Sequence, residues 1–204
     1  MLGFRWSRFL SGSGEGAEVP AVWFSSLPEL TTEHLLLRPL RMRDARDIFA
    51  YASDPEVARY VLWDPHTSLA DTRSYIRYMR GLYRRGLPSS WGVELRETGS
   101  VIGTVGFMWY SSQNLSAEVG YSFARKYWNR GYATEALRAA LCSAFASIPL
   151  NRIEAQHDVR NPASGRVMEK CGMKMEGILR QRIKNKGELA DVALWSVLRS
   201  DLEG

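Results

Sequence analysis

The feature that most constrains the fold of this chain is a strand followed almost at once by a long helix, within residues 116–147. Apolar side chains alternate along residues 116–123, which is the period of a strand. From residue 133 to residue 145, alanine, leucine and phenylalanine recur at spacings of three and four, which is the period of an amphipathic helix. Only a short segment around Arg130 and Gly131 separates the two patterns, so the chain passes from strand to helix in one turn.

The other periodic segments predict an α/β fold with a mixed sheet. Expected strands lie at residues 35–40, 91–95, 101–109, 116–123, 151–158, 174–183 and 189–198. Expected helices lie at residues 44–53, 68–85, 131–147 and 161–171, with a further helical turn opened by Pro55. This order is typical of neither a repeat protein nor a doubly wound dinucleotide-binding domain.

The N-terminal segment differs in composition from the rest of the chain. Residues 11–16 are rich in glycine and serine, which is typical of a flexible linker. Arg5 and Arg8 interrupt the apolar residues before it, which argues against a signal peptide. We therefore predict a flexible N-terminal extension at residues 1–30 and one ordered domain at residues 31–204. No apolar run approaches the ~20 residues that a membrane-spanning helix needs, so we expect no membrane partner.

Charge, cysteines and histidines narrow the class of protein. The net charge of +5 and the pI near 9.4 suit an anionic cofactor or partner, but no motif that reads DNA or RNA is present. Cys142 and Cys171 fall inside apolar helical patterns, so we expect free thiols in the core and a reducing, cytoplasmic setting. His34, His66 and His157 lack metal-ligand spacing, so no metal site is expected. Of the three, His157 stands at a strand end and is a minor candidate for the site.

The turn at residues 128–134 has the properties of a phosphate site. A helix N-terminus presents unpaired amides and the positive end of the helix dipole, and both favour an anion. Gly131 permits a close approach of the backbone, Ala133 leaves the turn uncrowded and Arg130 adds a positive charge. An ordinary strand-to-helix turn also contains a glycine, so the turn by itself leaves both interpretations open.

Two sequence blocks in order extend this interpretation. The first runs Ala-Glu-Val-Gly-Tyr-Ser-Phe from residue 117 and continues as Tyr-Trp-Asn-Arg-Gly-Tyr-Ala-Thr-Glu-Ala to residue 136. The second is Asn-Pro-Ala-Ser-Gly-Arg-Val-Met-Glu-Lys-Cys-Gly-Met at residues 161–173. Together they resemble the motifs of the GCN5-related (GNAT) N-acetyltransferases, and more narrowly the RimJ/RimL-like branch, which acetylates N-terminal amines of proteins, especially ribosomal proteins. The resemblance covers residues 31–198, and Trp128 stands where the family usually has glutamine or arginine.

The resemblance implies a GNAT fold, in which helices flank a mixed, mostly antiparallel central sheet, with acetyl-CoA as cosubstrate and a possible homodimer. It places the pyrophosphate on the turn, the pantetheine arm along the strand before it, and the thioester near the start of the 161–171 helix. The implied cofactor-binding residues are Tyr121, Ser122, Phe123, Asn129, Arg130, Gly131, Tyr132, Ala133, Thr134, Asn161 and Ser164.

The chemistry of acetyl transfer adds two candidate catalytic residues. Glu118 is the candidate general base, and the alternative is a structural carboxylate. Many GNAT enzymes use a tyrosine to protonate the departing thiolate, but Met168 occupies that position here. Ser164 is the replacement candidate, and the alternative is simple capping of the helix. A backbone amide within residues 121–123 would stabilise the oxyanion.

The acceptor is the least defined part of the prediction. The aromatic residues Trp63, Trp91, Trp109 and Tyr110 are typical of a core, but residues 60–63 and 108–110 fall where the RimJ/RimL-like branch often lines its acceptor cleft. We therefore predict an N-acetyltransferase acting on a primary amine, in the first place the N-terminal α-amine of a ribosomal or other basic protein. A small-molecule amine acetyltransferase and a non-catalytic CoA-binding module are the alternatives.

Overall fold

We describe the fold from a computed structural model, in which residues 18–201 are described. Within this range one sheet contains eight strands: β1 (Leu30–Thr31), β2 (Leu35–Pro39), β3 (Ser90–Leu95), β4 (Ser100–Ser111), β5 (Ser116–Phe123), β6 (Arg152–Asp158), β7 (Lys174–Asn185) and β8 (Glu188–Leu198). Their order is β1-β2-β3-β4-β5-β6-β8-β7. Every neighbouring pair is antiparallel except β5 and β6, which run parallel.

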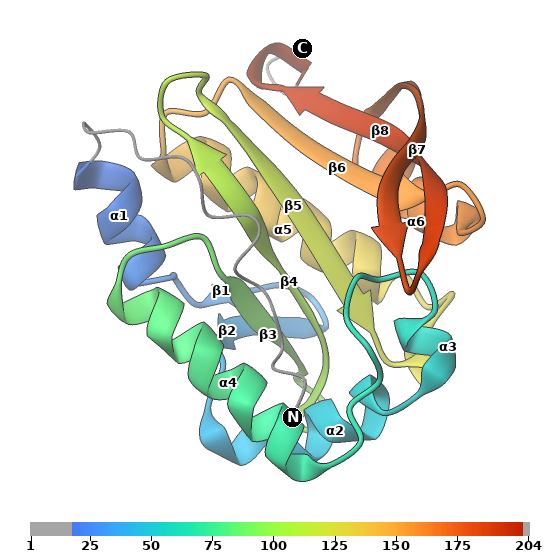
Figure 1. Cartoon of the computed structure of the whole chain (residues 1–204). Coiled ribbons are helices and arrows are strands. Elements are labelled where there is room, and N and C mark those ends of the chain that lie inside the picture. Colours follow the sequence, from blue (N-terminus) through green and yellow to red (C-terminus); the bar gives the residue numbers. More distant parts are fainter. Residues whose placement is uncertain (1–17, 202–204) are drawn as a thin grey trace.

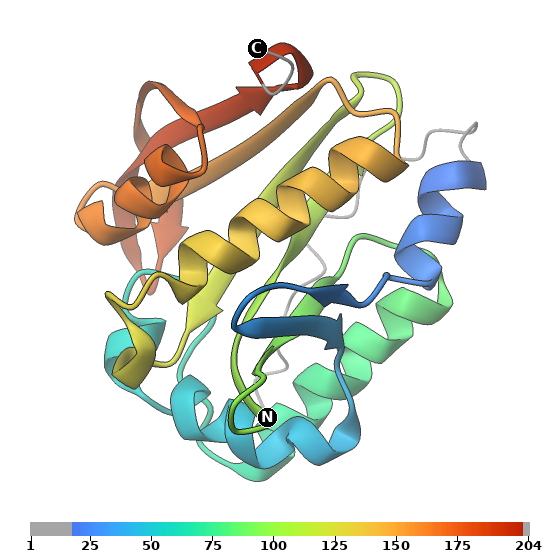
Figure 2. The same cartoon turned by 180° about the vertical axis from the view of Figure 1, so that it is seen from behind.

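Helices cover both faces of this sheet. The α-helices are α1 (Glu18–Ser25), α2 (Ala45–Ala52), α3 (Pro55–Ala58), α4 (Leu69–Arg84), α5 (Tyr132–Ser147) and α6 (Pro162–Lys170), and short 3-10 turns are η2 (Met42–Asp44), η3 (Arg125–Tyr127) and η4 (Arg199–Asp201). Figure 1 shows α2 and α4 on one face, and Figure 2 shows α5 crossing the other. The predicted α/β fold with a mostly antiparallel, helix-flanked sheet is confirmed. None of the helices in residues 18–201 is long and apolar enough to span a membrane.

The long helix α5 packs as its sequence predicts. Its buried side chains recur at spacings of three and four: Ala136, Leu137, Ala140, Leu141, Ala144 and Phe145. Cys171 is buried, but Cys142 is exposed, so the expectation of two core thiols is wrong for Cys142. The physical reason is its place on the helix, because one residue beyond Leu141 the helix has turned by about 100° away from the buried face.

The N-terminal region differs from its prediction. Residues 18–25, which we expected within a flexible extension, form α1. The first strand, β1, begins at Leu30, which we also expected within the extension. Phe24 is 1% exposed, and the Trp23 ring lies edge-on to Trp91, with ring centroids 5.6 Å apart. The aromatic burial that joins α1 to the core explains the difference, since fully burying such rings is strongly favourable. The expectations for residues 1–17 lie outside the described residues.

Candidate active site

The site begins where two parallel strands part. β5 pairs with β6 only through Ser116 to Glu118, although β6 continues along β8 to Asp158 and β5 continues along β4 to Phe123. Beyond Glu118 the two strands diverge (Figure 1). Within the described residues, the main chain of 119–123 therefore has no strand partner on the β6 side. This wedge, the gap between the diverging β5 and β6, leaves main-chain amide and carbonyl groups of β5 available to an extended ligand.

The turn after β5 leads directly into α5. Trp128, which is 43% exposed, donates from its ring Nε1 to the Phe123 carbonyl at 2.7 Å and so fastens the turn to the end of the strand. Asn129 and Gly131 take positive φ values of 59° and 86°. Gly131 occupies the N-cap position of α5, and because it has no side chain it cannot cap the helix. The space where a Cβ would stand is open. The first amides of α5 thus lack a side-chain cap, as the sequence predicts for a phosphate site.

Charged side chains around this turn favour an anion. Glu135, the acidic residue in the first turn of α5, is directed elsewhere, because its Oε1 accepts from Thr32 Oγ1 at 2.6 Å and from the His34 amide at 2.8 Å. Lys126 and Arg130 are exposed and both lie over the ring of Tyr127. The residues present therefore fit a pyrophosphate, with main-chain amides in front and cations beside them. Lys126 was not identified from the sequence.

Glu118 lies in a cavity of about 230 Å³ beside the wedge. Its Oε2 accepts from Trp109 Nε1 on β4 at 2.6 Å, and its Oε1 accepts from Gln156 Nε2 on β6 at 2.9 Å. Burial raises the pKa of Glu118, and the two donated hydrogen bonds oppose that rise. The carboxylate is therefore both fixed in orientation and a stronger base than an exposed glutamate. Neither Trp109 nor Gln156 was expected in this role.

Tyr121 and Ser164 meet across the lower part of the same cavity. The Tyr121 hydroxyl donates to the Ser164 carbonyl at 2.9 Å and lies 2.9 Å from Ser164 Oγ. Burial raises the pKa of Tyr121, so the phenol keeps its proton at neutral pH. Ser164 Oγ therefore bonds to this phenol rather than to an amide at the start of α6. Met168, which replaces the family's usual tyrosine, is buried and also lines the cavity.

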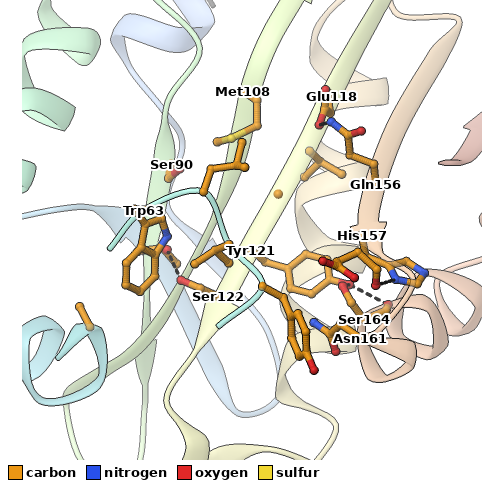
Figure 3. Close-up of a pocket in the computed structure, with 18 of the residues that line it drawn as sticks. Trp63, Ser90, Met108, Glu118, Tyr121, Ser122, Gln156, His157, Asn161 and Ser164 are labelled. Carbon is orange, nitrogen blue, oxygen red and sulfur yellow. Dashed lines mark hydrogen bonds between the residues drawn. The ribbon is translucent and has the colours of Figure 1, made fainter. Parts of the chain in front are cut away.

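Asn161 precedes α6 in the N-cap position, as the sequence predicts, but its side chain makes no capping hydrogen bond. It lines the cavity with Ser164 instead. Figure 3 shows Asn161, Tyr121 and Ser164 grouped together, with Glu118 and Gln156 further along the cavity. The structure thus brings Glu118, Tyr121, Ser122, Asn161 and Ser164 to one cavity, whereas Phe123 is buried in the core and does not line it. Their catalytic and binding roles stay predictions.

The predicted acceptor wall is present in part. Residues 60–63 all line the cavity, and so does Met108, which lies at an irregularity in the pairing of β4 with β5. Trp109 is turned to Glu118, and the Tyr110 ring packs 6.2 Å from that of Phe24, so these two residues do not line the cavity. Alternation along the strand separates Trp109 from Met108, whereas Tyr110, two residues after Met108, lies beyond the irregularity and packs near Phe24 of α1.

The three histidines lie in different places. His66 and His157 line the cavity, where His66 Nδ1 is 2.8 Å from Thr72 Oγ1 and His157 Nδ1 is 2.8 Å from the Asp158 carbonyl. His34 is paired with Glu135. Among residues 18–201, no three His, Cys, Asp or Glu side chains are grouped so as to hold a metal ion.

Comparison with known proteins identifies the family. The sequence matches the family described as "Acetyltransferase (GNAT) domain" over residues 34–174. It is 36% identical over 175 residues to the "Uncharacterized N-acetyltransferase p20" of Bacillus licheniformis, an alignment that covers 86% of this chain and 98% of that relative. The chain therefore belongs to the GNAT acetyltransferase family and is an N-acetyltransferase.

Solved structures agree with this family. The acetyltransferase (GNAT family) from Bacillus anthracis superimposes with a TM-score of 0.77 at 30% identity, covering 85% of this chain and 99% of that one. RimL, a ribosomal L7/L12 alpha-N-protein acetyltransferase solved in complex with coenzyme A, gives a TM-score of 0.75 at 19% identity and covers 83% and 96%. The fold is that of GNAT enzymes, and RimL shares it.

Proposed function

We propose that the protein transfers an acetyl group from acetyl-CoA to the N-terminal α-amine of a protein, with ribosomal proteins as the first candidates. One observation carries the proposal. The half-buried carboxylate of Glu118 and the hydroxyl pair of Tyr121 and Ser164 line one cavity, beside the divergence of β5 and β6. A proton acceptor and a proton donor that share one cavity meet the two needs of acyl transfer to an amine.

The cosubstrate would lie along the path from the turn to this cavity. Amides at residues 129–134 would hold the pyrophosphate, and Lys126 would add a charge beside it. Main-chain groups of Tyr121, Ser122 and Phe123 would pair with the amides of the pantetheine arm, as an added strand would. The Asn161 side chain, which makes no capping hydrogen bond to α6, would hydrogen-bond to the pantetheine arm near the thioester.

Glu118 would act first, by removing a proton from the acceptor. A free α-amine has a pKa of about 7.7–8.0, so at neutral pH a modest base must take one proton before attack. Each Glu118 oxygen accepts one hydrogen bond and keeps a further lone pair for that proton, directly or through a water molecule. The neutral nitrogen then attacks the thioester carbonyl carbon.

The hydroxyl pair would complete the reaction. As the new C–N bond forms, a main-chain amide within residues 121–123 would donate to the carbonyl oxygen, which gains negative charge. When the C–S bond breaks, the sulfur leaves with the electron pair and takes a proton from Ser164 Oγ. The Tyr121 phenol, 2.9 Å away, would turn its single O–H from the Ser164 carbonyl to Ser164 Oγ, replace that proton and regain one from solvent water. The phenol supplies from β5 the donor that Met168 lacks on α6.

The test is acetyl-CoA turnover over a set of N-terminal peptides and small amines, with acetyl-CoA affinity measured in parallel by calorimetry. We expect turnover with peptides and none with the same peptides blocked at the α-amine. Affinity for acetyl-CoA without turnover of any amine would favour a non-catalytic CoA-binding module. The absence of both would contradict the proposal.

A small-molecule amine is the second candidate acceptor, because the aromatic loop of residues 60–63 and the β7–β8 hairpin both approach the cavity and narrow it. RimL, an alpha-N-protein acetyltransferase with the same fold, supports the protein acceptor instead. A cytoplasmic location and a homodimer stay predictions.

A further inference from the structure

The tip of the β7–β8 hairpin is tied to the loop that follows α3. Lys186 Nζ donates to the Ala58 carbonyl at 2.7 Å and to the Val61 carbonyl at 2.8 Å, across 128 and 125 residues of sequence. Ala58 ends α3, and a cation is favoured at the carbonyl end of a helix. One ammonium therefore joins two segments that are far apart in the chain.

The two joined segments both line the cavity. Residues 60–63 contribute from the loop, and Ile183 and Val192 contribute from the hairpin. Figure 1 shows the hairpin tip beside the segment around α3. The contact of Lys186 thus spans the acceptor side of the site, where the width between the loop and the hairpin limits what can enter.

The backbone at Lys186 points to a role for its side chain. Asn185 pairs with Glu188, so Lys186 and Gly187 form a two-residue turn, with φ values of 48° and 92°. Turns with two positive φ values favour Asn-Gly, and a lysine in the left-handed region is unfavourable. A residue that suits the turn poorly therefore stands where a long cationic side chain reaches the loop.

A second contact spans the same opening. The Arg160 guanidinium lies 5.8 Å from the centre of the Tyr60 ring, and it is paired with Asp158 of β6 at 2.7 Å and with Glu188 of β8 at 3.4 Å. The Arg160 side chain is half-exposed, and Lys186 is also an exposed residue, although partial burial of its ammonium lowers its pKa. Of the two contacts, that of Lys186 carries two direct hydrogen bonds to the loop backbone and is the stronger tie.

We propose that Lys186 is a specificity-determining residue, which holds residues 58–63 against the β7–β8 hairpin and thereby limits the bulk of the acceptor. A peptide whose N-terminal residue has a small side chain enters between the loop and the hairpin while they are held together. A peptide with a bulky N-terminal side chain enters only when the hydrogen bonds of Lys186 break. The identity of the acceptor rests on the proposed function, but the tie itself is a property of the fold.

Three variants separate the effect of the Lys186 ammonium from the effect of the turn conformation. Lys186→Asn removes the cation but supplies a residue that favours the left-handed conformation, so the hairpin is retained. Lys186→Arg keeps a cation able to donate to both carbonyls. Lys184→Asn removes an exposed lysine of β7 that stands two residues before Lys186 and makes no hydrogen bond to residues 58–63 within the described part of the chain.

The first measurement needs no acceptor. Hydrogen exchange by mass spectrometry follows the peptide that contains residues 58–66 in each variant. We expect exchange about tenfold faster in Lys186→Asn, since the hydrogen bonds of a charged group are lost, with wild-type exchange in Lys186→Arg and Lys184→Asn. Unchanged exchange in Lys186→Asn would overturn the tie, whether or not the protein acetylates peptides.

The second measurement concerns selectivity. Two peptides of otherwise identical sequence begin with alanine and with phenylalanine, and kcat/KM is measured for each. We expect the phenylalanine-to-alanine ratio to rise about tenfold in Lys186→Asn and to return to the wild-type value in Lys186→Arg. Faster exchange with an unchanged ratio would overturn the selection by size. No turnover of either peptide by the wild type would instead count against the proposed acceptor, and the exchange measurement would still judge the tie.

Discussion

The turn of residues 128–134 offers a ligand mostly main-chain amides, whereas the region around Glu118 offers side chains. Around the turn, we expect cofactor binding to depend more on the conformation of Gly131 and the open space beside it than on side chains. Around Glu118, the orientation of one carboxylate depends on Trp109 and Gln156, which come from two other strands. Cofactor binding should therefore tolerate side-chain changes in the turn that do not alter its backbone. Turnover should not tolerate changes to Glu118, Trp109 or Gln156, which come from three strands.

The largest expected effect is at Glu118. Glu118→Gln keeps the shape of the side chain but removes the base, so kcat should fall about 10²–10⁴-fold while the affinity for acetyl-CoA stays unchanged. Steady-state kinetics and calorimetry measure the two quantities. Glu97→Gln, at an exposed turn, is the matched control and should behave as the wild type. Unchanged turnover in Glu118→Gln would remove it as the base.

The next effect tests the backbone of the turn. Gly131→Val forces a β-branched residue to a φ of 86° and should weaken acetyl-CoA binding about tenfold, because the left-handed conformation is strained for such a residue. Gly99→Val is the control, since Gly99 also has a positive φ, 69°, and open space at its Cβ, but it lies between β3 and β4. Both variants should lose similar thermal stability. Equal loss of acetyl-CoA affinity in both would show that the turn has no special part in binding.

A smaller effect is expected in the pH profile. Gln156 donates to the Glu118 carboxylate and so lowers the pKa that burial has raised. In Gln156→Leu this donor is lost, the charged form is less stable, and the pKa of Glu118 rises further. The acidic limb of the kcat/KM profile should therefore move to higher pH, and Trp109→Phe should move it in the same direction. A profile that stays in place in both variants would separate that limb from Glu118.

The smallest effect sharpens the contrast between main chain and side chain. Arg130 is exposed and lies over the Tyr127 ring, so Arg130→Ala should weaken acetyl-CoA binding only about threefold, as expected for an exposed charge. Its contribution should decrease further at high salt. A loss larger than that of Gly131→Val would mean that the side chain, not the backbone, holds the phosphates.

The same contrast explains what could be predicted from the sequence. The turn is contiguous, so the alternation of residues 116–123, the glycine and the helical period of α5 lie side by side and identify it. The strands and helices themselves were predicted because each has its own period. α1 was not, since it follows a glycine-rich segment and Trp23 and Phe24 are stabilised by contacts with distant rings.

Contacts between distant segments had no local signal. Gln156 is 38 residues from Glu118, and the hydroxyl pair of Tyr121 and Ser164 spans 43 residues. The sequence suggested Glu118 and Ser164 separately, but the partners that orient them depend on how β4, β5, β6 and α6 are placed. The contact of Lys186 was the hardest to predict, because the sequence around Lys186 contains no pattern that indicates a contact with the loop after α3.

The most direct test of the proposed chemistry is the position of the acetyl group in a product. A peptide with N-terminal alanine and one internal lysine is incubated with the protein and acetyl-CoA, and tandem mass spectrometry locates the added acetyl group. We expect it on the α-amine of alanine, with the lysine side chain unmodified. An acetyl group on the lysine, or none on the peptide beyond the level of Glu118→Gln, would contradict the proposal.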